Sequence, residues 1–335
     1  MDPLTQGVLG ATLPQATAAP KGSVAAAGLL GFLAGMSADL DVLIRSSSDP
    51  LLFLEYHRQF THSLVFIPVG GLLCALLLHW LIGKRRSLTF RQSLLFCTLG
   101  YATHALLDAC TTYGTMLFWP FSEMRIAWNT ISIIDPLFTL PMLLLIVLAG
   151  LKKRPAFARI ALVWGLAYMT LGLWQRNQAV EMGYEIASGR GHVPLRLEAK
   201  PSFANLLVWK IVYETEHKFY VDAVRATLSP EVFPGSSVAK LELARDFPWL
   251  DQHSQQARDI ERFRWFSNGY IARDPVYSNR VIDIRYSLIP NEVAPLWSIE
   301  LQPGAGALDH VAYLVHREPL GDRAALMRSM VMGGN

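Results

Sequence analysis

The sequence has few charged side chains for its length. They make up 17% of the 335 residues, hydrophobic residues make up 52%, and the mean hydropathy is positive. Soluble domains ordinarily carry about 25% charged residues, so this composition favours a membrane protein. The net charge of +3 is too small to indicate a nucleic-acid partner, and none is expected.

Cysteine is also scarce, because only Cys74, Cys97 and Cys110 occur and no Cys-x-x-Cys pair is present. This pattern predicts neither a disulfide framework nor a thiolate metal site. We expect the three cysteines to be small buried hydrophobic side chains. The N-terminal segment lacks the basic residues of a cleavable signal peptide, so the apolar segments themselves are expected to drive membrane insertion.

The two halves of the chain differ in composition. Residues 1–174 carry 8 acidic and 12 basic side chains, whereas residues 175–335 carry 19 and 18. The first half contains apolar runs that approach or reach the ~20 residues needed to cross a bilayer, at 23–38, 62–83, 91–111, 131–151 and 156–174. A weaker run at 4–19 is either a sixth span or an interfacial helix. We therefore predict an α-helical polytopic membrane domain of five or six spans over residues 1–174.

Basic residues between these runs predict the orientation in the membrane. Two basic loops, 84–91 and 152–159, separate apolar runs, and Lys21 precedes the first strong one. Short loops rich in Lys and Arg remain in the cytoplasm. The connecting segments at 39–62 and 112–130, and everything after residue 174, are then expected on the outer side of the membrane.

The second half has the pattern of a soluble domain. Residues 205–215 and 218–228 predict a β-hairpin around Glu216-His217, and residues 280–289 and 295–301 predict two further strands. Residues 254–267 have the apolar spacing of a helix. After a polar connection at about 175–203, we expect an extracytoplasmic α+β domain with an antiparallel sheet, within the unit 175–335. Its five scattered histidines lack ligand spacing.

Ionisable residues of the first half concentrate at the predicted outer surface. His104 and Asp108 are four residues apart and project from one face of a helix; a structural His–Asp clamp between helices is the alternative. Asp39 and Asp41 follow a helix C-terminus, which favours cations over carboxylates; a solvated turn is the alternative there.

The segment "HRQFTHS" places His57 and His62 five residues apart, about 140° around an ideal helix. This spacing is poor for one helical face, so we expect His57 in a loop and Thr61 as the cap of a helix that begins near His62. Interfacial polar residues with no ligand role are the alternative interpretation.

Neutral imidazoles and carboxylates together are the ligand set of zinc, manganese or iron. We predict one or two divalent ions bound by Asp39, Asp41, His57, His62, His104 and Asp108. A substrate anion would be oriented by Arg58, Arg125 and Asn129. His79 is expected to be structural, and Asp135 to cap the helix that starts at Pro136.

Residues 1–150 resemble the YdjM-type family of LexA-binding, inner-membrane-associated, metal-dependent hydrolases. The resemblance rests on the segments "MDPLTQGVLGA", "SADLD", "HRQFTHS", "THALLDACTTYGTMLFWPF" and "IDPLFTLP". Many relatives have Thr-His where this chain has Thr5-Gln6, and an amide is a poorer metal ligand than an imidazole. Relatives often have Pro-Asp-x-Asp where this chain has Ala38-Asp39-Leu40-Asp41, so both carboxylates are kept.

The chain is more distantly similar to zinc phospholipases C and related single-strand nucleases. They share a His-x-x-x-Asp helix motif, which His104 and Asp108 match, together with an upstream Asp and His. This similarity implies phosphoester hydrolysis at a zinc cluster.

Together, these observations predict a metal-dependent hydrolase of the bacterial inner membrane. Its expected substrate is a phosphoester or other ester of a lipid-like molecule at the outer face, and its expected ion is zinc, with manganese or iron as alternatives. Two other functions remain open. One is a non-catalytic sensor or adaptor with a structural metal site; the other is a proton-coupled transporter with His104 and Asp108 as its relay.

Overall fold

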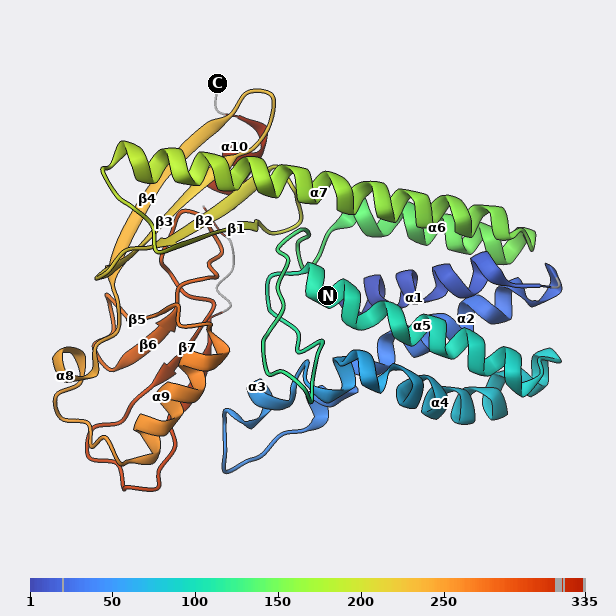
Figure 1. The fold of residues 1–335 in the computed structure, drawn as a ribbon, viewed down its shortest axis with the longest axis horizontal. Coiled ribbons are helices and arrows are strands. Elements are labelled where there is room, and N and C mark those ends of the chain that lie inside the picture. The colour runs from blue at the N-terminus through green and yellow to red at the C-terminus, as the bar shows by residue number, and fades with distance from the viewer. Residues whose placement is uncertain (20, 317–320, 322, 334–335) are drawn as a thin grey trace. The chain divides into compact units, whose positions relative to one another are not determined.

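The chain divides into a helical unit and a β-rich unit. The computed structural model describes residues 1–19, 21–316, 321 and 323–333 (Figure 1). The helical unit comprises Met1–Leu43, Tyr56–Trp174 and Phe203–Asn205, and the β-rich unit comprises Ile44–Glu55, Gln175–Ser202 and Leu206–Asn335.

The helical unit is built from long apolar helices that lie side by side (Figure 1). In chain order they are α1 (Pro3–Thr17), α2 (Val24–Met36), α4 (Ile67–Leu78), α5 (Phe90–Cys110), α6 (Pro136–Lys152) and the first part of α7 (Pro155–Gly189). Their starts follow local rules, since Thr89 and Gln92 form a capping box on α5 and Asp135 caps α6. The prediction for Asp135 is thus confirmed.

Four helical stretches are long and apolar enough to cross a membrane: Val24–Leu43, Leu64–Arg86, Phe90–Cys110 and Pro155–Gly189. The apolar helix α6 is shorter, with 17 residues. Three leucines of α4 are more than half exposed, among them Leu73 at 57% and Leu77 at 59%. An exposed apolar face of this kind suits contact with lipid rather than water.

Glycines let α1 and α2 approach each other closely. A Cβ atom on Gly35 of α2 would lie 2.8 Å from the Gln6 carbonyl oxygen and 2.9 Å from the Gly10 Cα of α1. Small residues at helix interfaces permit this close packing in membranes. As a consequence, the Gln6 side chain of α1 and the end of α2 lie beside α5, where His104 and Asp108 are found.

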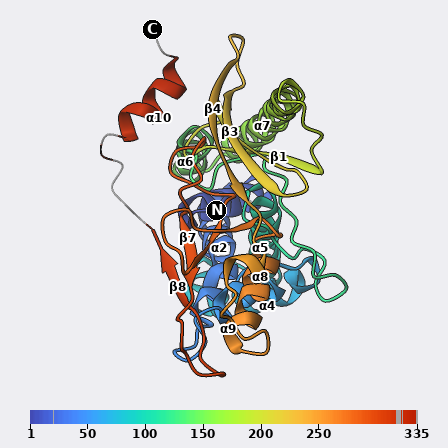
Figure 2. The same cartoon turned by 90° about the vertical axis from the view of Figure 1, so that its left-hand side faces the viewer.

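The β-rich unit contains two four-stranded antiparallel sheets (Figures 1 and 2). The first is β1 (Arg196–Pro201), β2 (Val208–Glu214), β3 (Lys218–Arg225) and β4 (Glu231–Ala239); the second is β5 (Ile271–Arg273), β6 (Arg280–Asp283), β7 (Trp297–Glu300) and β8 (Ala312–Val315). Both sheets contribute to a buried core formed by Val212, Phe219, Val221, Tyr270, Ala272, Ile282, Ile284 and Val293. The other described α-helices are α3 (Leu52–Tyr56), α8 (Leu243–Asp246), α9 (Gln255–Phe266) and α10 (Arg323–Met332).

The coarse fold prediction is confirmed: a helical N-terminal region precedes an α+β unit with antiparallel strands. The predicted hairpin forms from β2 and β3, and residues 254–267 contain helix α9. Two sheets are present where we expected one. The predicted polar connection at 175–203 was wrong, because α7 continues as a helix to Gly189 and β1 follows at Arg196.

Candidate metal centre

The two aspartates after α2 lie in a short 3-10 helix, Ser37–Leu43. This turn follows α2 directly and has no basic residue in its last turn. Both carboxylates therefore lie at the C-terminal, negative end of the helix dipole. Asp41 is buried and Asp39 is partly buried. The prediction of an exposed, solvated turn as the alternative does not fit the burial of Asp41.

The histidines of "HRQFTHS" follow helix α3. His57 lies in the turn after Tyr56, as expected, and its Nδ1 is 2.8 Å from Asp41 Oδ1. His62 ends a 3-10 turn, Phe60–His62, and is fully buried. The prediction that Thr61 caps the next helix was wrong: Ser63 accepts the capping bond from Phe66, and the Thr61 hydroxyl donates to Asp41 Oδ2 at 2.8 Å.

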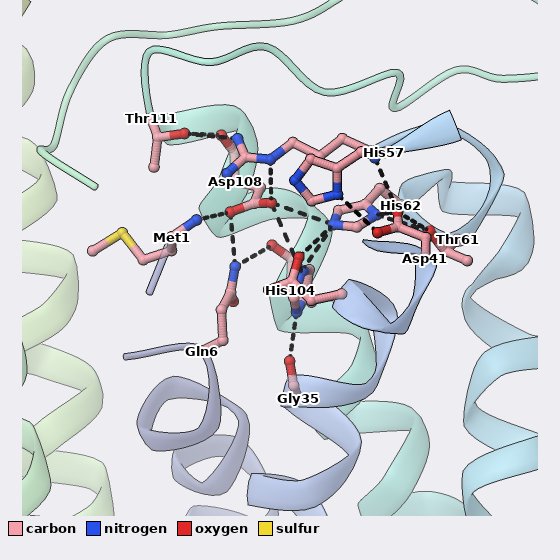
Figure 3. Close-up of polar contacts among 12 residues, drawn as sticks. Met1, Gln6, Gly35, Asp41, His57, Thr61, His62, His104, Asp108 and Thr111 are labelled. Atoms are coloured by element: carbon pink, nitrogen blue, oxygen red, sulfur yellow. Dashed lines mark hydrogen bonds and ion pairs between the residues drawn. The ribbon is translucent and has the colours of Figure 1, made fainter. Parts of the chain in front are cut away.

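The remaining two predicted ligands lie on the last turns of α5. His104 and Asp108 are both fully buried and both face the His57–His62 segment (Figure 3). His104 Nε2 lies 2.9 Å from His62 Nε2, and Asp108 Oδ2 lies 3.3 Å from that same His62 atom. The i, i+4 spacing therefore places both side chains at one point, as the sequence predicted.

These side chains form two groups of converging ligand atoms. In the first group, Asp39, His62, His104 and Asp108 each offer one atom within 4.8 Å of the others. In the second, Asp39, Asp41 and His57 do the same. Asp39 belongs to both groups, so its carboxylate could contribute to holding either one ion or two.

Hydrogen bonds fix which imidazole nitrogens are available to a ligand. His104 Nδ1 donates to the Gly35 carbonyl oxygen at 2.5 Å. The Thr61 hydroxyl already donates to Asp41, so it accepts from His62 Nδ1 at 2.9 Å. In the neutral rings, both Nε2 atoms then carry lone pairs, and these point toward each other and toward carboxylate oxygens. Such lone pairs repel unless a proton or a metal cation lies among them.

The electrostatic field of the cluster attracts cations. Burial opposes protonation of His62, but its contacts with Asp108, Asp39 and Asp41 outweigh burial and raise its pKa to about 10. Burial lowers the pKa of His57; the contact with Asp41 opposes this effect, and the charge of Arg58 adds to it. The lowered pKa favours the neutral ring, which is the form that binds metals.

Asp108 is held by groups around the cluster (Figure 3). Its Oδ1 accepts a hydrogen bond from Gln6 Nε2 at 2.8 Å and contacts the Met1 amino group. Its Oδ2 is buried and accepts no hydrogen bond, although Arg58 Nε lies 3.0 Å away. Partners of this kind orient a ligating carboxylate, while the second oxygen stays directed at the histidines.

The three predicted substrate-orienting residues lie in different surroundings. Arg58 is buried, forms an ion pair with Asp108, and donates a hydrogen bond to the Thr111 hydroxyl at 3.1 Å. The Arg125 side chain donates to the Gly114 carbonyl oxygen, and the backbone N–H of Asn129 donates to the Thr111 carbonyl oxygen. Arg125 and Asn129 thus belong to the segment that follows α5, and they are not among the converging ligand atoms.

Residues assigned no ligand role by the sequence also have partners of their own. His79 Nδ1 is 2.9 Å from the Ser93 hydroxyl, which fits a structural histidine. All three cysteines are free thiols. The sequence did not predict that the Gly35 carbonyl orients the His104 ring or that the Thr61 hydroxyl orients the His62 ring. For Thr61, its position next to His62 was a signal; for Gly35, the sequence held none.

Fold and site together define a membrane protein whose span-length helices carry a buried His/Asp cluster able to hold a metal ion. The family model of the YdjM inner membrane protein matches residues 1–179, more than half of the chain. The chain belongs to this family, and the resemblance drawn from its motifs is confirmed.

Two curated relatives extend this finding. The chain is 37% identical over 111 residues to the inner membrane protein YbcI of Escherichia coli (strain K12), covering 31% of this chain and 60% of that protein. It is 25% identical over 206 residues to the protein YfhP of Bacillus subtilis (strain 168), covering 59% of each. The chain thus spans about three fifths of the length of each of these relatives. No solved structure matches it.

Proposed function

We propose that this protein is a metal-dependent hydrolase of the inner membrane, acting on a phosphoester or other ester of a lipid-like substrate. One observation carries the proposal. Two imidazole Nε2 atoms and the carboxylates of Asp39 and Asp108 converge within 4.8 Å inside a protein whose helices are long enough to span a bilayer. Ionisable residues inside membrane segments are costly and mark functional sites.

The donor set fits a divalent ion. Two imidazoles and two carboxylates suit zinc, with manganese or iron as alternatives. Asp39, His62, His104 and Asp108 would hold one ion, and Asp39, Asp41 and His57 a second. When bound, such ions supply the Lewis acidity that activates water and polarises an ester.

Other residues of the chain prepare this site. Asp41 orients His57 through its Oδ1 and accepts the Arg58 amide and the Thr61 hydroxyl at its Oδ2. Arg58 neutralises part of the negative charge next to Asp108. We propose that Arg58, Arg125 and Asn129 orient the substrate anion once it is bound.

The position of the cluster on the helices supports the proposal of a lipid-like substrate. Asp39 and Asp41 are near the end of the span-length stretch Val24–Leu43, and Asp108 is near the end of Phe90–Cys110. The site thus belongs to the ends of apolar helices, where an ester next to an acyl chain can enter. With the basic loops at 84–91 and 152–159 in the cytoplasm, this end faces outward. We propose that residues 1–174 form the membrane domain and 175–335 an extracytoplasmic domain.

An assay with purified full-length protein in detergent micelles tests the hydrolase. Phospholipids and lipid phosphates are supplied with Zn²⁺ or Mn²⁺, and ester turnover is measured. We expect turnover that Asp41→Asn and Asp39→Asn lower by at least about 100-fold, more than is typical for outer-shell residues. His79→Ala, a histidine in the same helical unit bonded to Ser93, should keep wild-type turnover.

One observation favours a different function. The Nε2 atoms of His62 and His104 are 2.9 Å apart, close enough to share a proton, as a relay in a proton-coupled transporter would require. Metal analysis separates the two. A preparation that binds no divalent ion and is indifferent to His57→Ala would support the relay and contradict the hydrolase. Tight metal binding without turnover of any ester would instead support the sensor or adaptor.

A further inference from the structure

The segment Ile44–Glu55 lies between two proposed metal ligands in the sequence but belongs to the β-rich unit. The chain leaves the helical unit after Leu43 and returns to it at Tyr56. Asp41 therefore precedes the crossing by two residues, and His57 follows the return directly. Between any other two proposed ligands that are consecutive in the sequence, the chain stays within the helical unit.

The two ends of this segment meet at the candidate metal centre. His57 Nδ1 lies 2.8 Å from Asp41 Oδ1, and the Arg58 amide donates to Asp41 Oδ2 at 2.9 Å. The segment thus closes a loop whose closing contact is the Asp41–His57 pair. Holding the interior of a loop in place lowers the entropic cost of bringing its ends together.

Within the β-rich unit, Arg262 of α9 holds this loop. Its Nη1 and Nη2 donate to the two Asp49 oxygens at 2.9 and 2.8 Å, and its Nε donates to Glu55 Oε1. The bidentate contact with Asp49 has the geometry that makes Arg–carboxylate pairs strong and directional. Asp259, one turn earlier on α9 and fully buried, accepts from Nη1 at 2.9 Å and aims the guanidinium.

Apolar contacts fix the same segment. Leu51 is completely buried and Leu54 is 3% exposed. The ring of Phe53 packs edge-on against Tyr313 of β8, with centroids 5.1 Å apart. Asp49 also accepts the Leu51 amide at 3.0 Å, so one carboxylate both starts the turn into α3 and binds Arg262.

We infer that Arg262 is a positioning residue for the candidate metal centre, through which the β-rich unit holds the loop that brings His57 to Asp41. This inference rests on the proposed metal centre and deepens it by naming its regulation. Glu55, which accepts from Arg262, is only two residues from His57. A change in the contact between α9 and the loop would therefore alter the position of His57. Partner binding or unfolding at α9 would then loosen the His57 side of the site.

Cobalt(II) titration of the full-length protein tests this role, because the visible spectrum of Co²⁺ reports its ligands. Arg262→Gln removes the positive charge and the bidentate contact of the guanidinium with Asp49. We expect Co²⁺ to bind about tenfold more weakly, at the low end of effects from outer-shell partners, with a changed visible spectrum. Arg264→Gln is the matched control, since Arg264 lies on α9 but pairs with Glu261 of the same helix. It should bind Co²⁺ as the wild type does.

Changes in the loop test the same contact without altering α9. Asp49→Asn combined with Glu55→Gln should reproduce the weaker binding and the changed spectrum of Arg262→Gln. Adding Arg262→Gln to this pair should weaken binding no further, because all three changes break one contact. Thermal unfolding is followed in parallel. A variant with a less stable β-rich unit but a wild-type cobalt spectrum would contradict the positioning role.

The two proposals can fail separately. A wild-type chain that binds no Co²⁺ overturns the proposed metal centre and this inference with it. A wild type that binds Co²⁺, together with Arg262→Gln and loop variants that match it in affinity and spectrum, overturns only the inference.

Discussion

Two completely buried carboxylates, one in each unit of this protein, have different surroundings. In the β-rich unit, Asp283 is completely buried, and its oxygens accept from Arg285 Nε and Nη2, the Arg285 amide and the Trp297 indole. In the helical unit, Asp108 is equally buried, but its Oδ2 accepts no hydrogen bond and faces His62 and His104.

The difference separates structural charge from ligand charge. A buried carboxylate surrounded by donors is satisfied, and its removal costs stability. Asp108 Oδ2 instead faces the Nε2 atoms of His62 and His104 beside its ion pair with Arg58. A cation among these atoms would relieve the repulsion between their lone pairs.

His104→Ala removes a lone pair from the centre of the four-ligand group. We expect the purified variant to retain essentially no tightly bound divalent ion, measured by elemental analysis after dialysis. Asp135→Asn is the control, because Asp135 is a buried carboxylate of the same unit that caps α6 and accepts from Tyr168. Loss of metal in the control but not in His104→Ala would reverse the assignment.

Asp283→Asn breaks the satisfied pair with Arg285 in the β-rich unit. Leaving Arg285 buried without its full partner should lower the free energy of unfolding of this unit by about 3–5 kcal/mol. The metal content should not change. Urea unfolding followed by tryptophan fluorescence measures the first effect, and elemental analysis the second. A stable variant that has lost its metal would contradict the comparison.

Gln6→Ala removes the amide that orients Asp108. The carboxylate keeps its place in the ligand group but loses a fixed orientation, so we expect metal to bind about tenfold more weakly with unchanged stoichiometry. Gln15→Ala, a buried glutamine on the same helix, should leave the affinity unchanged. Isothermal titration with Zn²⁺ compares them, and equal affinities in both variants would show that Gln6 does not support the site.

Lys210 is a buried basic side chain of the β-rich unit. Burial lowers its pKa from about 10.5 to about 7, despite contacts with the Ser287 hydroxyl and the Glu292 carbonyl oxygen. The unfolded chain then binds the proton more tightly than the folded one between these values. The free energy of unfolding should rise with pH from about 7 to 10.5, by at most about 1.4 kcal/mol per unit.

Unfolding at several pH values measures this slope. Lys210→Met should remove it, whereas the exposed Lys218→Met should retain it. A slope that survives in Lys210→Met would assign the pH dependence to another group.

The sequence predicted the elements whose signals are local. The hairpin of β2 and β3 consists of two runs rich in β-branched and aromatic residues on either side of a short polar turn, and α9 has an apolar stripe, so both were found. The second half of α7 was missed because residues 175–189 are polar and lack the pattern of a span. Its helix is completed by packing: Gly183 lies against Leu197 and Ile211, which only the folded β-rich unit brings there.

The same reasoning applies to the candidate site. Ligand types and the i, i+4 spacing of His104 and Asp108 were visible in the sequence, so all six ligand positions could be proposed. Their orientation was not visible. The Gly35 carbonyl reaches His104 only because α2 packs closely on its neighbours, and Thr61 serves His62 through a bond to Asp41 that depends on the fold.

X-ray absorption spectroscopy of the zinc-loaded protein tests the central claim most directly. We expect a first shell of imidazole nitrogens and carboxylate oxygens at about 2.0–2.2 Å, with a smaller imidazole contribution in His62→Ala. A shell of water oxygens, or an imidazole signal that His62→Ala leaves unchanged, would contradict the account.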